Sequence, residues 1–155
     1  MTHQELMRQA IRLSEENVQN GGGPFGAVIA KDGEVIATGV NRVTANNDPT
    51  AHAEVSAIRA ACQKVENFKL DGCVVYSSCE PCPMCLSALY WAGVSKIYYA
   101  NTKDDAKAIN FDDSFIYEQL SLERNARSIA SEQMLHDEAQ KAFEMWRDKE
   151  DKTEY

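Results

Sequence analysis

The stretch Ser-Ser-Cys-Glu-Pro-Cys-Pro-Met-Cys at residues 77–85 places three cysteines at intervals of three. Proline has no backbone N–H, so Pro81 and Pro83 must lie before a helix or within its first turn. The helix is therefore expected to begin near Cys82. Cys82 and Cys85 then lie on one face at the positive end of the helix, where a thiolate is favoured.

The third cysteine of this stretch, Cys79, falls before the predicted helix. We expect it to be a small buried residue, with a role beside the ligands or in redox chemistry as the alternative. As a fourth metal ligand it would fill the position that the chemistry needs.

One histidine fits the same site. His3 and His136 are expected on helix surfaces among charged residues, whereas His52 lies at the start of a predicted helix over 51–64. His52, Cys82 and Cys85 are ligands of the kinds that Zn²⁺ takes. Three protein ligands with a water or hydroxide in the fourth position are typical of catalytic zinc, whereas structural sites normally have four protein ligands.

Glu54 follows His52 by two residues. In the middle of a helix, residues two apart point in different directions, but at the first turn both can face a metal near the helix end. A carboxylate next to a zinc-activated water can act as a general base. Taken alone, Glu54 would be explained by its interaction with the helix dipole. Beside His52 and the two cysteines, we interpret it as the catalytic base.

The bulk properties limit the class of protein. A length of 155 residues suits one domain. No apolar run is long enough to cross a bilayer, and no signal peptide is present, so a cytoplasmic protein without a membrane partner is expected. Five cysteines are then expected as thiols or metal ligands. The net charge of −8 argues against a nucleic-acid partner and favours a small neutral substrate.

The order of predicted elements indicates an α/β fold with a mixed sheet and helices on both of its faces. Helices are expected at 3–19, 51–64, 82–92 and 135–149, with two short helical stretches within 103–120. Strands are expected on both sides of the Asp32-Gly33 turn, at 73–77, at 96–100 and, weakly, near 126–131.

The spacing of the site residues is the most specific feature of the chain. The chain contains His52-Ala-Glu54 and, after 26 further residues, Pro81-Cys82-Pro-Met-Cys85. This spacing matches the signature of zinc deaminases that act on nucleobases. The chain therefore resembles the cytidine deaminase-like superfamily. Within it, the chain is similar to the bacterial guanine deaminases over nearly its full length. The matching stretches are GGPFGAVI, NDPTAHAEVSAIR, YSSCEPCPMCLSALYWA, FDDSFIY and the terminal KTEY.

This resemblance implies a three-layer sandwich with a five-stranded mixed sheet and one Zn²⁺ per subunit. The implied reaction, part of purine metabolism, converts guanine to xanthine and ammonia. A single domain, 1–155, would form a homodimer that exchanges its C-terminal segments, about 135–155.

The resemblance also assigns roles to further residues. Asn41 would hydrogen-bond the purine, Phe25, Ala53 and Trp91 would line its pocket, and Asp113 would orient the substrate or shuttle protons. Tyr155 would close the pocket, that of the partner subunit in an exchanged dimer. Without the resemblance, these residues would be interpreted as a hairpin exit (Asn41), core aromatics (Phe25 and Trp91), a helix N-cap (Asp113) and a frayed terminus (Tyr155).

Two alternatives remain open from the sequence. One is a deaminase of another base, such as the adenosine of a transfer RNA, cytosine or a triazine related to guanine. The other is a structural zinc module without activity, which would have Cys79 as a fourth ligand.

Overall fold

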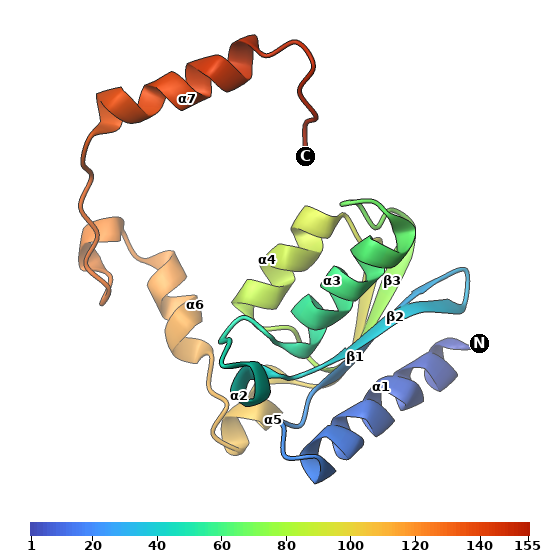
Figure 1. Cartoon of the computed structure of the whole chain (residues 1–155). Helices are drawn as coiled ribbons and strands as arrows, with labels where there is room; N and C mark the ends of the chain where they lie inside the picture. Colours follow the sequence, from blue (N-terminus) through green and yellow to red (C-terminus); the bar gives the residue numbers. More distant parts are fainter. The chain divides into compact units, whose positions relative to one another are not determined.

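The computed structural model describes residues 1–155, which form two compact units, residues 1–114 and residues 115–155. The first unit contains helices, strands and their connections in alternation (Figure 1). Its elements are α1 (His3–Gln19), β1 (Gly26–Lys31), β2 (Glu34–Val40), α2 (Val43–Asn46), α3 (Ala53–Val65), β3 (Cys73–Cys79), α4 (Pro83–Ala92), β4 (Lys96–Asn101) and α5 (Lys103–Ala108). The predicted elements of this unit are confirmed, and the short helix α2 was not predicted.

A tight turn begins the sheet. Asp32 and Gly33 both have positive φ, 51° and 79°, as the two central residues of a type I′ hairpin turn require. β1 and β2 are therefore antiparallel neighbours. The strand order is β2-β1-β3-β4, with β3 antiparallel to β1 and parallel to β4, so the sheet is mixed as predicted.

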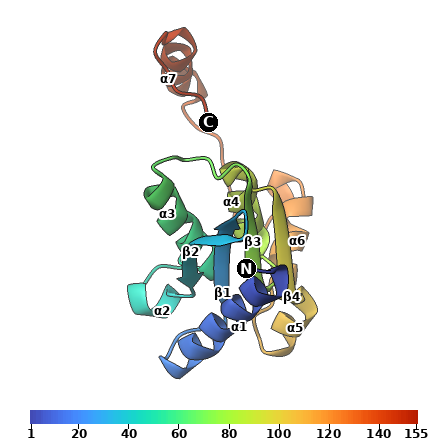
Figure 2. The ribbon, with the colours of Figure 1, turned by 90° about the vertical axis from the view of Figure 1, so that its right-hand side faces the viewer.

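Helices cover both faces of this sheet and give the first unit three layers (Figure 2). Successive residues of a strand point to opposite faces, and β1 shows this with Val28 on one side and Ile29 on the other. Val28 packs with Leu6 and Ala10 of α1. Ile29 belongs to a separate hydrophobic cluster on the opposite face of the sheet. Its members from α3 and α4 are Ala53, Ala57, Ala61, Leu89 and Ala92.

The alanines of α3 allow this helix to lie very close to β2. A Cβ built at Gly39 of β2 would be 2.3 Å from the carbonyl oxygen of Ala53 and 2.5 Å from the backbone nitrogen of Ala57. Only glycine leaves room for the helix backbone here. Gly39 thereby fixes the distance of the N-terminal turn of α3 from the sheet.

The second unit contains α6 (Ser114–Ser121, which begins at the boundary), the 3₁₀ helix η1 (Arg124–Ala126) and α7 (His136–Asp148). None of these elements has a buried residue. The helix predicted at 135–149 is confirmed.

The strand predicted near 126–131 is wrong, and the sheet has four strands instead of five. Residues of this segment bond locally instead. The backbone N–H of Ser128 donates to Oε1 of Gln119 at 2.8 Å, and the side-chain Nε of Arg127 donates to the Gln119 carbonyl oxygen at 3.1 Å. Ile129 is 83% exposed, so no apolar side chain holds this segment against a sheet.

No helix in the structure is long and apolar enough to span a membrane.

Candidate metal centre

The first ligand candidate, His52, is the residue that caps the N-terminus of α3. Its backbone is extended (φ −69°, ψ 160°) and the helix begins at the next residue. The loop before it is tied down by Asp48, which accepts hydrogen bonds from the backbone N–H and the hydroxyl of Thr50. Arg59 of α3 reaches back to Thr50 Oγ1 at 3.3 Å and to Asp48 at 3.6 Å. These contacts hold His52 at a defined place on the helix end.

The two cysteines occupy the equivalent place on α4. Cys82 is the N-cap residue with an extended backbone (φ −66°, ψ 170°), Pro83 is the first helical residue, and Cys85 lies within the first turn. The start of this helix is therefore where the two prolines predicted it. Because α3 and α4 pack side by side on one face of the sheet, their N-terminal ends bring His52 and both thiols together.

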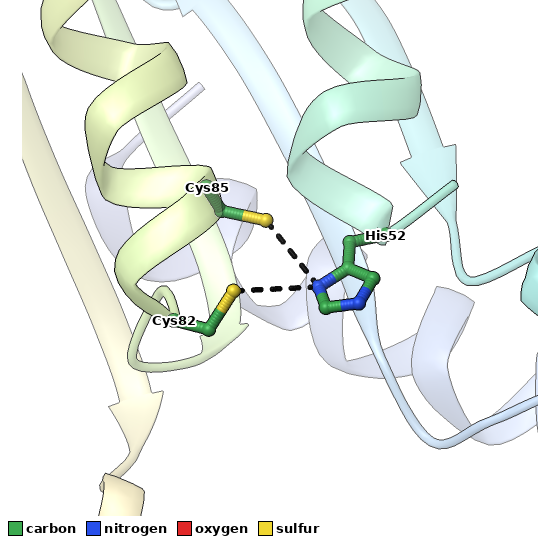
Figure 3. A group of neighbouring side chains, drawn as sticks. All are labelled: His52, Cys82 and Cys85. Atoms are coloured by element: carbon green, nitrogen blue, oxygen red, sulfur yellow. Dashed lines mark hydrogen bonds between the residues drawn. The ribbon is translucent and has the colours of Figure 1, made fainter. Parts of the chain in front are cut away.

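The three ligand atoms converge on one point (Figure 3). Nδ1 of His52 lies 3.4 Å from Sγ of Cys82 and 3.5 Å from Sγ of Cys85, and all three atoms lie within 4.8 Å of one another. A tetrahedral zinc ion with Zn–S of about 2.3 Å and Zn–N of about 2.05 Å separates its nitrogen and sulfur ligands by about 3.6 Å. The donor set and its spacing therefore fit Zn²⁺.

The ionisation of the two cysteine thiols favours the binding of a cation. A hydrogen bond from the Cys85 thiol, followed by one with His52, lowers the pKa of Cys82 well below the usual value of a thiol. The same hydrogen bond raises the pKa of Cys85. One thiolate is thus favoured before any metal arrives, and the helix N-terminus adds to this preference. A bound dication then favours loss of the second thiol proton.

Glu54 lies next to the ligands and is a buried residue, only 6% exposed. After the hydrogen bond with Cys82 and burial, the nearby charge of Glu54 helps to raise the pKa of the Cys85 thiol. Oε1 of Glu54 is 2.7 Å from Oγ of Ser77, a residue of β3 that the sequence analysis does not single out. A buried carboxylate needs such donors, because the charged form is otherwise very costly to bury.

Cys79 is not part of the metal group. It ends β3, is buried, and its thiol lies 3.7 Å from the carbonyl oxygen of Thr102. Burial raises its pKa to about 11, so it stays a neutral thiol at neutral pH. This agrees with the expectation of a buried structural cysteine.

Asn41 and Phe25 lie where β2 ends and β1 begins. The N–H of Asn41 donates to the carbonyl oxygen of Phe25 at 3.2 Å, and its own Oδ1 accepts from the N–H of Val43 at 3.1 Å. Asn17, a buried residue of α1, donates from Nδ2 to the carbonyl oxygens of Gly23 and Asn41. No sequence motif marks Asn17, which fixes the backbone of Asn41 across 24 residues of sequence.

The ring of Phe25 has a partner that the sequence analysis also missed. Phe111 meets it edge to face, with ring centroids 5.0 Å apart. This contact brings the segment that carries Asp113 to the same side of the first unit. Asp113 is half-buried, and burial, followed by the nearby charges of Cys82 and Glu80, raises its pKa.

Ala53 is fully buried at the first position of α3. Its side chain belongs to the core, and its backbone N–H is one of the N–H groups at a helix start that have no partner within the helix.

Two sequence candidates do not join the metal group. Trp91 lies at the C-terminal end of α4, opposite the end that carries Cys82 and Cys85, and is 68% exposed. Tyr155 belongs to the second unit, where it lines a hollow together with Phe143 and Trp146. It is 79% exposed.

Comparison with known proteins agrees with this geometry. Residues 1–101 match the cytidine and deoxycytidylate deaminase zinc-binding region. A guanine deaminase of Bacillus subtilis (strain 168) is 49% identical over 156 residues, which cover 100% of each protein. The X-ray structure of a guanine deaminase from Bacillus subtilis superimposes with a TM-score of 0.97 over 100% of this chain and 99% of that chain. A tRNA-specific adenosine deaminase of Aquifex aeolicus is 37% identical over 64% of this chain and 66% of that protein.

Proposed function

Because the chain belongs to the cytidine and deoxycytidylate deaminase zinc-binding family, we propose that it is a zinc-dependent guanine deaminase, a hydrolase of a carbon–nitrogen bond. The observation that carries the proposal is the 49% identity with a guanine deaminase over the full length of both proteins. The similarity to the tRNA-specific adenosine deaminase covers only 64% of the chain. The net charge of −8 also disfavours a tRNA substrate.

Zinc is held by His52, Cys82 and Cys85, and when bound it lowers the pKa of water so that hydroxide is available at neutral pH. Glu54 is placed beside these ligands to take the proton of the attacking water. The oxygen adds to C2 of guanine, and Glu54 returns the proton to a ring nitrogen. The amine then takes up a proton, also through Glu54, and the C2–N bond breaks. The products are xanthine, with a carbonyl at C2, and ammonia.

The purine is bound by residues of the first unit. Asn41 hydrogen-bonds the purine edge. Asn17 fixes the backbone of Asn41, and the bond from the N–H of Val43 orients its side chain, so its amide is held ready for the base. The N–H of Ala53 donates to an oxygen or ring nitrogen of the base. Phe25 forms a wall of the pocket, and Asp113 orients the substrate or shuttles a proton.

A second copy of the chain completes the site in this proposal. α7 buries none of its residues, and Phe143, Trp146 and Tyr155 all remain exposed. Exposed aromatic side chains gathered on one helix and the tail beside it are typical of a surface that another molecule covers. This exposure supports a homodimer that exchanges residues from about 135 to 155, in which Tyr155 closes the pocket of the partner and Trp91 lines the purine pocket.

The proposed enzyme acts in the cytoplasm. All five cysteines are free in the structure. A reducing compartment keeps the zinc-binding thiols available.

The deciding experiment is ammonia release from a panel of substrates. The panel contains guanine, adenine, cytosine, a guanine-like triazine, the matching nucleosides and tRNA. Guanine is expected to be turned over with the highest kcat/KM, and a higher value for any other member would refute the assignment. In the cobalt-substituted protein, added guanine should change the visible spectrum, whereas a structural zinc module with four protein ligands would show no change.

A further inference from the structure

We propose that Ser77 is a positioning residue for the reaction: it holds Oε1 of Glu54, so that Oε2 is the oxygen that takes and delivers protons. This inference rests on the proposed deaminase function. It assigns a task to a residue that lies outside the metal group and outside the substrate contacts described above.

The first support is the geometry of the contact. Oγ of Ser77 and Oε1 of Glu54 are 2.7 Å apart, and the two residues are only 2% and 6% exposed. Ser77 lies on the face of β3 that packs against α3, the face on which Val75 belongs to the hydrophobic core. A hydroxyl thus replaces an apolar side chain on this face, directly beneath the carboxylate.

The second support is that the other possible hydrogen-bond donor to Glu54 is lost once zinc is bound. The Cys85 thiol is the other possible donor near Glu54, but a thiol that ligates zinc has lost its proton and has no hydrogen to donate. Ser77 keeps its proton when zinc is bound. It is therefore the donor that fixes the carboxylate in the metal-loaded protein.

The third support is a second contact of the same hydroxyl. Oγ of Ser77 is 2.6 Å from the carbonyl oxygen of Cys79, two residues further along β3. A hydroxyl has one proton to donate, so it bonds either the carboxylate or the carbonyl. The charged carboxylate is the stronger acceptor, so the proton goes to Glu54 rather than to Cys79. When Glu54 carries the transferred proton on Oε2, its Oε1 is still an acceptor, and Ser77 continues to donate to it. Glu54 thus keeps a partner on Oε1 throughout the cycle.

The test compares Ser77→Ala with Ser78→Ala. Ser78 is a matched control, because it is the adjacent residue of β3 and is also buried. Its replacement removes a single hydrogen bond, which Ser78 Oγ accepts from the N–H of Gly26 at 3.0 Å. Ser77→Ala is expected to lower kcat by about 10–100-fold, as misplacement of a reacting group does. Its KM, its zinc content and its affinity for xanthine in calorimetry should stay near the wild-type values. Ser78→Ala should keep kcat near the wild-type value.

A double-mutant cycle shows whether Ser77 acts through Glu54. Glu54→Asp shortens the side chain by one methylene and removes the contact. In that background, Ser77→Ala should cause no further loss, since coupled residues are not additive. The inference is overturned if Ser77→Ala retains full kcat, if it loses zinc, or if it lowers kcat by the same factor in both backgrounds. If the wild-type protein released no ammonia from guanine, the proposed function would fail first, which distinguishes the two failures.

Discussion

Replacing Gly39 with alanine should disturb the metal centre from the opposite side of α3. The added Cβ would lie 2.3 Å from the carbonyl oxygen of Ala53, about 1 Å short of the 3.4 Å at which ordinary contact begins. The obstacle is backbone, as is the nitrogen of Ala57 at 2.5 Å, so no side-chain rotation can relieve it. The first turn of α3 must move away from β2 by roughly 1 Å.

The size of the effect follows from this overlap. Overpacking of this kind costs about 1–3 kcal/mol, and the restricted unfolded chain of the alanine variant offsets about 0.4–1 kcal/mol. A net loss of about 1–2 kcal/mol lowers Tm by about 2–8 °C in a domain of this size. Because the displaced turn carries Glu54 and is preceded by His52, kcat should also fall, by about 10–100-fold.

Gly26→Ala is the control for general overpacking. A Cβ there would lie 2.5 Å from the carbonyl oxygen of Ala10 in α1, on the other face of the sheet. This variant should lose similar stability in thermal unfolding followed by circular dichroism, yet keep more of its kcat and its zinc. Equal losses of kcat in both variants, or an unchanged Tm in Gly39→Ala, would refute the reasoning.

Three further outcomes are expected. Glu54→Ala should lower kcat for guanine by about 10²–10⁴-fold while retaining one zinc per chain by atomic absorption; retained turnover would remove Glu54 from its role. Chelation of zinc, or Cys82→Ser, should abolish activity and lower Tm together, and zinc addition should restore only the chelated wild type, because metal binding is linked to folding. Hydrogen bonds from Thr2 lower the pKa of Glu5 below its usual 4.5, so the stabilisation is complete above pH 4.5 and is lost as the pH falls through the lower folded value. In urea titrations, Glu5→Gln should therefore lose less free energy of unfolding than the wild type as the pH falls below 4.5. An unchanged loss would show that Glu5 does not stabilise the fold in this way.

The sequence predicted those parts of the site that depend on local chain chemistry. Pro81 and Pro83 restrict where a helix can begin, and this alone places Cys82 and Cys85 on a helix start. The same kind of local signal, Asp32-Gly33, correctly predicted the hairpin that begins the sheet.

The parts that escaped prediction depend on contacts between distant residues. Ser77 is 23 residues from Glu54, and its neighbour Ser78 looks identical in sequence although it serves a different partner. Asn17 reaches Asn41 across 24 residues. The predicted fifth strand failed for a similar reason, because the Gln119 side chain takes the N–H of Ser128 that a neighbouring strand would need.

The placement of ligands at two helix starts has a consequence for the motion of the backbone. His52 and Cys82 occupy the positions where serine, threonine or aspartate usually accepts a hydrogen bond from the first turn, and neither makes such a bond. The first turns of α3 and α4 therefore lack side-chain caps, and the metal in front adds to the packing behind them and, for α3, to the contacts of Arg59 and Ser77. Loss of zinc should be felt there before anywhere else in the first unit, as faster amide hydrogen exchange at two sites 30 residues apart. The metal centre thus also links the N-terminal ends of α3 and α4 and stabilises the first turn of each helix.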